Sequence, residues 1–184
     1  MGKQQVGVIV GSLRQASFSK VVANYVASQL SDFDVKFIDI SDLPIYNEDL
    51  EGGDKTPSTW TRFRGDVGPL NAVLFVTPEY NRSMPAAIKN ALDVGSRPYG
   101  ASVWSGKPGA VISVSPGALG GFGANHNLRQ VATFLDIAMM QQPEAYVGNI
   151  ANATSDGVVK DESVQGFLST FAKAFTAWVN RLSA

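Results

Sequence analysis

Residues 72–81 decide the fold of this chain, and they read AVLFVTPEYN. The five residues from Ala72 to Val76 are all apolar, which is typical of a β-strand covered on both of its faces. Pro78 has no N–H group to donate to a neighbouring strand, so the strand is expected to end there. A strand of this kind belongs in the middle of a parallel sheet, with the polar residues that follow it at the carboxyl edge.

Other stretches of the chain continue this pattern. Residues 6–10 read VGVIV and are followed by Gly11 and Ser12. Further strands are predicted at residues 35–40, 109–115 and 145–147, the first of them alternating and therefore nearer the edge of the sheet. Apolar residues at helical spacing predict five helices, at residues 21–30, 56–67, 85–96, 125–138 and 164–182. Residues 42–54 and 149–161 are predicted to be loops.

Strands and helices alternate along the chain, with no repeat and no low-complexity linker between them. This alternation favours an open parallel sheet with helices on both faces. Five such units fit a flavodoxin-like, three-layer α/β sandwich with strand order 2-1-3-4-5, formed by residues 1–184 as a single domain. In this architecture a ligand binds beyond the carboxyl ends of the strands, beside the switch point between strands 1 and 3.

The composition excludes several classes of function. The chain has 15 basic and 16 acidic residues and a net charge of −1, so nucleic acid and a membrane surface are not expected partners. No apolar run is long enough to cross a bilayer and no signal-peptide pattern is found, so we expect a cytoplasmic protein. Zero cysteines and one histidine exclude thiolate chemistry and a multi-histidine metal centre. Redox chemistry would therefore need a bound cofactor.

Three loops follow strands that meet at one edge of the predicted sheet. The first loop, residues 11–19, reads GSLRQASFS and leads into a helix. Free N–H groups at a helix start, several hydroxyls and one arginine suit a phosphate dianion. The loop equally suits an ordinary serine-capped helix with a surface arginine. It matches neither the Walker A motif nor the glycine pattern of dinucleotide-binding folds.

The second loop, residues 77–85, lies between Pro78 and Pro85 and contains Tyr80 and Asn81. It offers an aromatic face and amide groups to a flat heterocycle, although a lone tyrosine more often packs on a neighbouring helix. The third loop, residues 115–123, has four glycines, which allow close approach of a ligand to the backbone. Glycine-rich turns also occur without a ligand, so the coincidence of the three loops is the stronger indication.

Six short motifs make the chain resemble the NADPH-dependent FMN reductase family, and within it the bacterial chromate or quinone reductase branch. They are GSLR at 11–14 with Ser17, TPEYN at 77–81 with Ser83, KNALD at 89–93, SRP at 96–98, GKP at 106–108 and LRQ at 128–130. The resemblance runs from residue 6 to about residue 147. The motif at 77–81 is the most specific of the six.

The resemblance implies a set of FMN-binding residues and no catalytic side chain. Side chains expected to hold the phosphate are Ser12, Arg14, Ser17 and Ser19, with Phe18 contributing its backbone. Residues expected to border the isoalloxazine ring are Pro78, Glu79, Tyr80, Asn81, Ser115 and Gly117. Some members have arginine and tyrosine where this chain has Gly123 and His126, at a tetramer contact that involves a glutamate matching Glu144.

The same resemblance implies the activity. Hydride would pass from NADPH or NADH to FMN, and electrons would then pass to a small-molecule acceptor in a ping-pong cycle. Quinones are the expected acceptors, with chromate, azo compounds and free flavin as further ones. The resemblance also implies a homodimer or homotetramer.

Alternative interpretations are also consistent with the residues. Arg97 would bind the nicotinamide donor or an anionic acceptor, or it would be a surface or interface residue at a helix end. His126 would protonate a reduced acceptor, or it would be a capping or interface residue. The whole chain would alternatively be an electron carrier of the flavodoxin kind, without an NAD(P)H site. A flavin-free signalling module is disfavoured because no acidic cluster follows strands 1 and 3.

Overall fold

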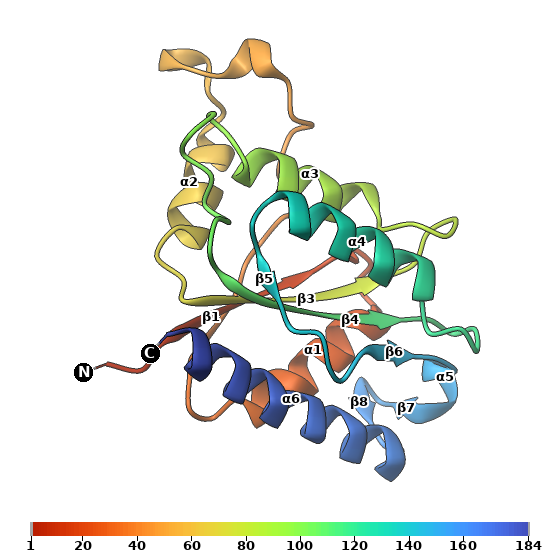
Figure 1. Cartoon of the computed structure of the whole chain (residues 1–184). Helices are drawn as coiled ribbons and strands as arrows, with labels where there is room; N and C mark the ends of the chain where they lie inside the picture. Colours follow the sequence, from red (N-terminus) through yellow and green to blue (C-terminus); the bar gives the residue numbers. More distant parts are fainter. Residues whose placement is uncertain (1, 184) are drawn as a thin grey trace.

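The computed structural model describes residues 2–183 and has one large parallel sheet (Figure 1). Its strands are β1 (Gln5–Val10), β2 (Asp34–Phe37), β3 (Ala72–Pro78), β4 (Pro108–Val114), β5 (Ala138–Met139) and β6 (Ala145–Val147). The strand order is β2-β1-β3-β4-β5, and β6 also pairs with β4. The flavodoxin-like α/β fold and the predicted order are therefore confirmed.

Helices cover both faces of the sheet (Figure 1). Helices α1 (Phe18–Gln29) and α6 (Glu162–Leu182) lie on one face. The other face carries α2 (Ser58–Val67), α3 (Ala86–Gly95) and α4 (Phe122–Phe134). Successive side chains of a strand point to opposite faces. Leu74 and Val76 therefore belong to the core on the α1 and α6 face, and Val73 and Phe75 belong to the core on the face of α2, α3 and α4. The continuous apolar run at 72–76 is explained by this two-sided burial.

The end of α4 and the fifth strand differ from the prediction. The helix expected at 125–138 starts at Phe122 and ends at Phe134. Asp136 has a φ of 58° and turns the chain out of the helix, after which Ile137 donates its N–H to Ala132 O. The apolar residues at 137–139 continue the helical spacing, but they belong to the turn and to β5. The predicted single strand at 145–147 is thus the second half of an interrupted edge, of which β5 is the first half.

Two predicted loops contain short regular elements. The stretch 149–161 forms α5 (Ile150–Ala153) and a small hairpin of β7 (Thr154–Ser155) and β8 (Val158–Val159). Asp156 and Gly157 both have positive φ at the turn of this hairpin, a conformation that aspartate and glycine tolerate. The stretch 42–54 contains a 3-10 turn at Glu48–Leu50, and a second one, Gly53–Lys55, begins at its end.

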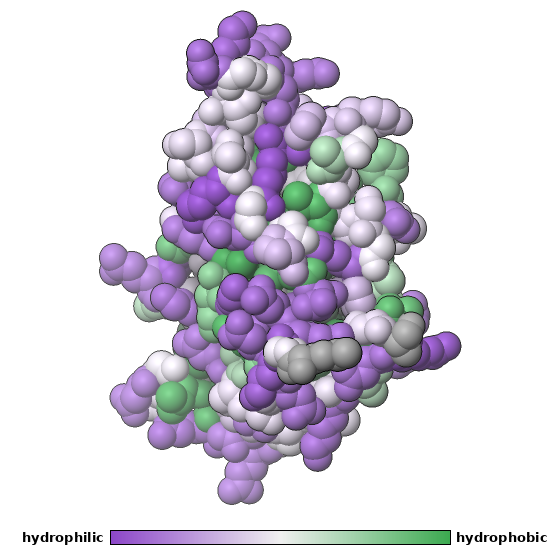
Figure 2. Space-filling view, turned by 90° about the vertical axis from the view of Figure 1, so that its left-hand side faces the viewer, coloured by the Kyte–Doolittle hydropathy of each residue, from purple (hydrophilic) through white to green (hydrophobic). Residues whose placement is uncertain are grey.

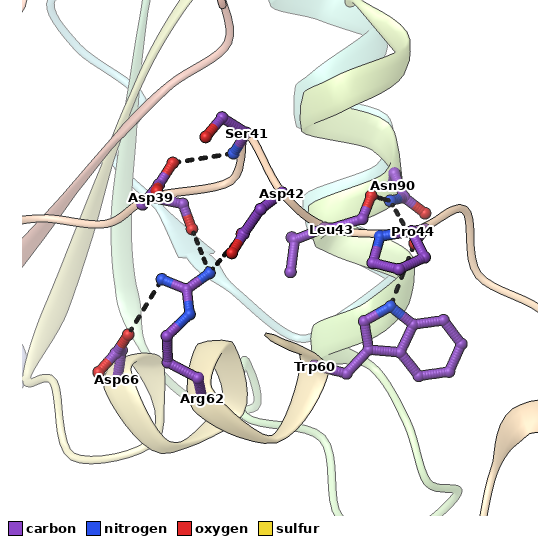
Figure 3. Close-up of polar contacts among 9 residues, drawn as sticks. All are labelled: Asp39, Ser41, Asp42, Leu43, Pro44, Trp60, Arg62, Asp66 and Asn90. Carbon is purple, nitrogen blue, oxygen red and sulfur yellow. Dashed lines mark hydrogen bonds and ion pairs between the residues drawn. The ribbon is translucent and has the colours of Figure 1, made fainter. Parts of the chain in front are cut away.

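The segment after β2 is held against α2 and α3 by polar side chains (Figure 3). The buried Asn90 of α3 accepts a hydrogen bond from Tyr46 N and donates to Leu43 O and Pro44 O, at 2.8, 3.1 and 3.0 Å. Trp60 of α2 donates to Pro44 O at 3.1 Å. The KNALD motif therefore contributes a clamp for this long segment.

The molecular face at the amino ends of the strands is mostly hydrophilic, with scattered apolar spots (Figure 2). Here Lys107, from the GKP motif, donates to Gly68 O and Leu70 O just after α2. Among residues 2–183 no helix is long and apolar enough to span a bilayer.

Candidate functional site

The three loops meet at the carboxyl edge of the sheet and enclose a pocket of about 250 Å³. Nine of the predicted site residues line it: Ser12, Arg14, Ser17, Phe18, Ser19, Pro78, Glu79, Tyr80 and Ser115. Val114 and Pro116 line it as well and were not predicted, since an apolar strand end carries no polar signal. Asn81 and Gly117 are not among the lining residues.

One end of the pocket is the start of α1. Ser17 caps this helix and accepts a hydrogen bond from Lys20 N at 3.2 Å. The N–H groups of Phe18 and Ser19 have no acceptor within residues 2–183. Unpaired N–H groups and the positive end of the helix dipole favour an anion at this position. The observed serine cap and the predicted anion site therefore involve the same loop and are compatible.

Arg14 lies beside this helix start. Its Nε donates to Ala16 O at 2.8 Å, its Nη2 donates to the same oxygen, and the guanidinium lies 5.4 Å from the centre of the Phe18 ring. The side chain is exposed, and its only bonded partner within the described residues is a backbone carbonyl of its own loop. A bound dianion would offer this guanidinium a stronger, charged acceptor.

The second loop is a tight turn. Tyr80 N donates to Ser83 O at 2.9 Å, and Ser83 N donates back to Tyr80 O at 3.0 Å. Asn81 and Arg82, the two central residues, have φ values of 50° and 65°. This double positive φ is that of a type I′ turn, which asparagine tolerates and arginine rarely adopts. Asn81 stands at the tip of the turn and so lies outside the pocket lining.

The side chain of Glu79 is directed to α4. One carboxylate oxygen accepts from Ala124 N at 3.0 Å and the other accepts from Arg82 Nη1 at 3.2 Å. Helix α4 has Gly121 at its N-cap, which has no side chain to do this. Gly123 allows the approach, because a Cβ there would lie 2.5 Å from Arg82 O. This cap between two loops could not be found from sequence spacing.

The glycines of the third loop have a packing role. Gly120 has a φ of 60°, and a Cβ on it would lie 2.5 Å from the carbonyl carbon of Tyr146. Gly117 O accepts from Asn149 N at 3.2 Å, and Ser115 N donates to Val147 O at 2.9 Å. These contacts hold the third loop against the end of β6, and the glycines allow the backbones of the two segments to approach closely.

His126 and Arg97 lie outside the pocket lining. His126 Nε2 lies 2.9 Å from the hydroxyl of Tyr146, and the His126 ring packs on Phe122 with centroids 4.2 Å apart. Burial raises the pKa of Tyr146 to about 12, and the hydrogen bond and negative charge of Glu144 add to the shift. Arg97 lines separate depressions beside Tyr99. Residues 2–183 contain no group of three side chains suited to a metal ion.

The fold and the site define a flavodoxin-like α/β protein with a pocket at the carboxyl edge of its sheet. Residues 5–152 match the model of the NADPH-dependent FMN reductase family, and the chain belongs to this family. Its members use FMN and NAD(P)H, so the chain is an oxidoreductase with these cofactors.

Individual relatives agree with this assignment. The chain is 53% identical over 175 residues to a quinone reductase of Pseudomonas putida, covering 95% of this chain and 94% of that protein. It is 44% identical over 177 residues to a 2-hydroxy-1,4-benzoquinone reductase of a Burkholderia species, covering 95% and 96%. The solved structure of a flavoenzyme NAD(P)H:(acceptor) oxidoreductase from Paracoccus denitrificans superposes with a TM-score of 0.87 at 40% identity, covering 97% and 98%.

Proposed function

We propose that the chain binds FMN in the pocket between the three loops and reduces quinones with electrons from NAD(P)H. The observation that carries this proposal is the start of α1, where two unpaired N–H groups, buried serines and Arg14 lie at one end of the pocket. These donors match the charge and the oxygen atoms of a phosphate monoester.

The remaining pocket residues suit the flat ring of the flavin. Pro78 and Tyr80 line one side, and Ser115 and Pro116 line the other. The second loop is restrained by its tight turn and the third loop by its contacts with β6, so both form fixed edges of the pocket. Asn81 and Gly117, which do not line the pocket, would approach the ring only if it extends beyond the present lining. FMN, when bound, supplies the chemistry of accepting hydride and passing electrons on.

The protein's own part in the reaction is binding and orientation. Glu79 is occupied by α4 and Arg82, and the pocket contains no histidine, lysine or cysteine that would act as an acid or base. We therefore assign no catalytic side chain. Quinones are chosen as acceptors because the two relatives from Pseudomonas and Burkholderia are named for quinones. A single pocket used in turn by donor and acceptor fits a ping-pong cycle.

The test is the visible spectrum of the purified protein, reconstituted with FMN and mixed anaerobically with NADPH or NADH. We expect bound flavin that bleaches with a nicotinamide and recovers when a quinone is added. Flavin that binds but is reduced by neither nicotinamide would make the chain an electron carrier instead. Absence of flavin binding would refute the assignment of all three loops.

A variant without the positive charge of Arg14 tests the phosphate site separately from the rest of the pocket. Arg14→Gln should weaken FMN binding about tenfold or more, because it removes a charged donor. The control is Arg181→Gln, in the last turn of α6, which should bind FMN as the wild type does. Equal affinities of both variants would contradict the phosphate assignment.

The wider organisation is also proposed. We infer that residues 1–184 form a single domain, that two or four copies assemble, and that the enzyme works in the cytoplasm. The interrupted edge strand and the exposed Tyr99 and Phe134, which are 93% and 88% exposed, leave surface for another copy. Light scattering of the purified protein measures the number of copies.

A further inference from the structure

A second pocket lies on the other side of the first loop. It has a volume of about 340 Å³ and lies between this loop and the end of β2. Its lining residues include Leu13, Lys20, Phe37 and Asp39. Ser12 and Arg14 line both pockets, so the two cavities lie on either side of these residues.

The apolar part of this second pocket is open to solvent. Leu13 is 54% exposed and Phe37 is 48% exposed, although both are large apolar side chains. They come from different segments, the first loop and the end of β2, and they line the same cavity. Apolar pockets with a few placed polar groups are the usual form of small-molecule sites. The face of a flat aromatic base can pack on such a surface.

The polar part contains both signs of charge. Asp39, just after β2, is exposed, and one of its carboxylate oxygens accepts from Ser41 N at 2.9 Å. This hydrogen bond from the backbone, together with a second one from the Ser41 side chain, lowers the pKa of Asp39, so the group is ionised at neutral pH. Arg14 and Lys20 bring two cations to the same cavity. A ligand that matches it needs hydroxyl donors for Asp39 and anionic groups for the cations.

We propose that this pocket binds the adenosine half of the nicotinamide donor. The adenine packs on Leu13 and Phe37, the ribose diol donates to Asp39, and the diphosphate lies near Lys20, because Arg14 is assigned to the FMN phosphate. A carboxylate at the end of the second strand is suited to a ribose diol, as in other open α/β sheets. Because the pockets share Ser12 and Arg14, a dinucleotide that passes over these residues reaches from one pocket into the other. The inference rests on the proposed function of the first pocket.

The sign of the charge at Asp39 has a consequence for the donor. The carboxylate accepts hydrogen bonds from a free 2′-hydroxyl but repels a 2′-phosphate. The enzyme therefore prefers NADH to NADPH. Replacing Asp39 by asparagine keeps an oxygen for Ser41 N and removes only the charge, so the preference should shrink or reverse.

The experiment uses the FMN-loaded protein and two probes that cannot reduce it, adenosine 5′-diphosphoribose and its 2′-phosphorylated form. Calorimetry should give about tenfold tighter binding of the first probe, since one charged hydrogen bond is exchanged for a repulsion. Asp39→Asn should remove most of this ratio, and Phe37→Ser should weaken both probes. Asp34→Asn is the matched control, because Asp34 is an exposed carboxylate at the other end of β2. Its ratio should equal that of the wild type.

Steady-state rates give an independent readout. Asp39→Asn should raise the KM for NADH about tenfold, while saturating NADH still reduces the flavin. Absence of probe binding, or an unchanged ratio in Asp39→Asn, would overturn the inference. Neither result touches the proposed function, whose failure is recognised separately by the loss of flavin binding or of flavin reduction by both nicotinamides.

Discussion

The carboxylate of Glu79 accepts a hydrogen bond from the backbone N–H of Ala124 at 3.0 Å. Ala124 is the third residue of α4, a position whose N–H group is normally satisfied by the side chain of an N-cap residue. The residue at the N-cap is Gly121, so the second loop supplies the missing acceptor. The wall of the proposed flavin pocket and the start of α4 are therefore one connected unit.

Removing this cap should destabilise the protein. Glu79→Ala should lower the free energy of unfolding by about 1–2 kcal/mol, because a buried N–H group and the helix dipole lose their acceptor. Glu79→Gln, which keeps an acceptor oxygen, should cost less. Urea denaturation measures both variants, and the exposed Asp32→Ala serves as the control. An Ala variant as stable as the control would show that the cap contributes nothing.

Two helical glycines should respond in opposite directions to alanine. A Cβ at Gly123 meets Arg82 O at 2.5 Å and the Glu79 carboxylate at 2.9 Å, so Gly123→Ala should destabilise the protein by about 1–3 kcal/mol. A Cβ at Gly166 in α6 has no atom within 4 Å, so Gly166→Ala should stabilise it by about 0.5–1 kcal/mol. Thermal unfolding of the two variants and the wild type measures both changes in stability. The same sign for both variants would contradict the described approach of α4 to the second loop.

The clamp at Asn90 should control the segment after β2. Asn90→Ala leaves Tyr46 N and Leu43 O without their partners, which should cost about 2 kcal/mol or more. The neighbouring Lys89→Ala breaks only an exposed ion pair with Asp93 and should cost less than about 1 kcal/mol. Limited proteolysis should cut residues 42–57 faster in the first variant alone. Similar cleavage of both would mean that the segment is held by other contacts.

The pH dependence of stability should report on Tyr146. Its pKa is raised from 10.0 to about 12 in the folded protein, chiefly by burial, with further contributions from its hydrogen bond to Glu144 and from the charge of Glu144. The unfolded state therefore releases this proton at a lower pH, and stability falls as pH rises through that window. Tyr146→Phe should remove this part of the slope. Tyr99→Phe, at a 93% exposed position, should leave it unchanged.

The tyrosinate absorbance gives the same test without unfolding. Tyr146 should ionise later than a free tyrosine, and this late component should be missing in Tyr146→Phe. A late component that persists in this variant would assign the raised pKa to another tyrosine.

Local signals were sufficient for most of the fold and for the three loops, whereas the individual residues of the candidate site came from the family resemblance. The buried run at 72–76 and the run at 6–10 are recognisable because a strand covered on both faces has no polar side. Nine of the eleven residues that the resemblance implied line one pocket, and the loops that contain them gather because the carboxyl ends of adjacent parallel strands meet at one edge. The exceptions, Asn81 and Gly117, depend on the exact shape of their turns, which spacing does not define.

The sequence by itself determined the order of strands and helices, the edge at which the loops gather and the absence of thiol chemistry. These follow from periodicity, chain direction and composition, which are properties of neighbouring residues. Only the tertiary structure decided where α4 ends, how Glu79 caps it and that Leu13, Phe37 and Asp39 line a second pocket. Each depends on residues far apart in the chain, whose contacts are selected by packing and hydrogen bonding in the folded state.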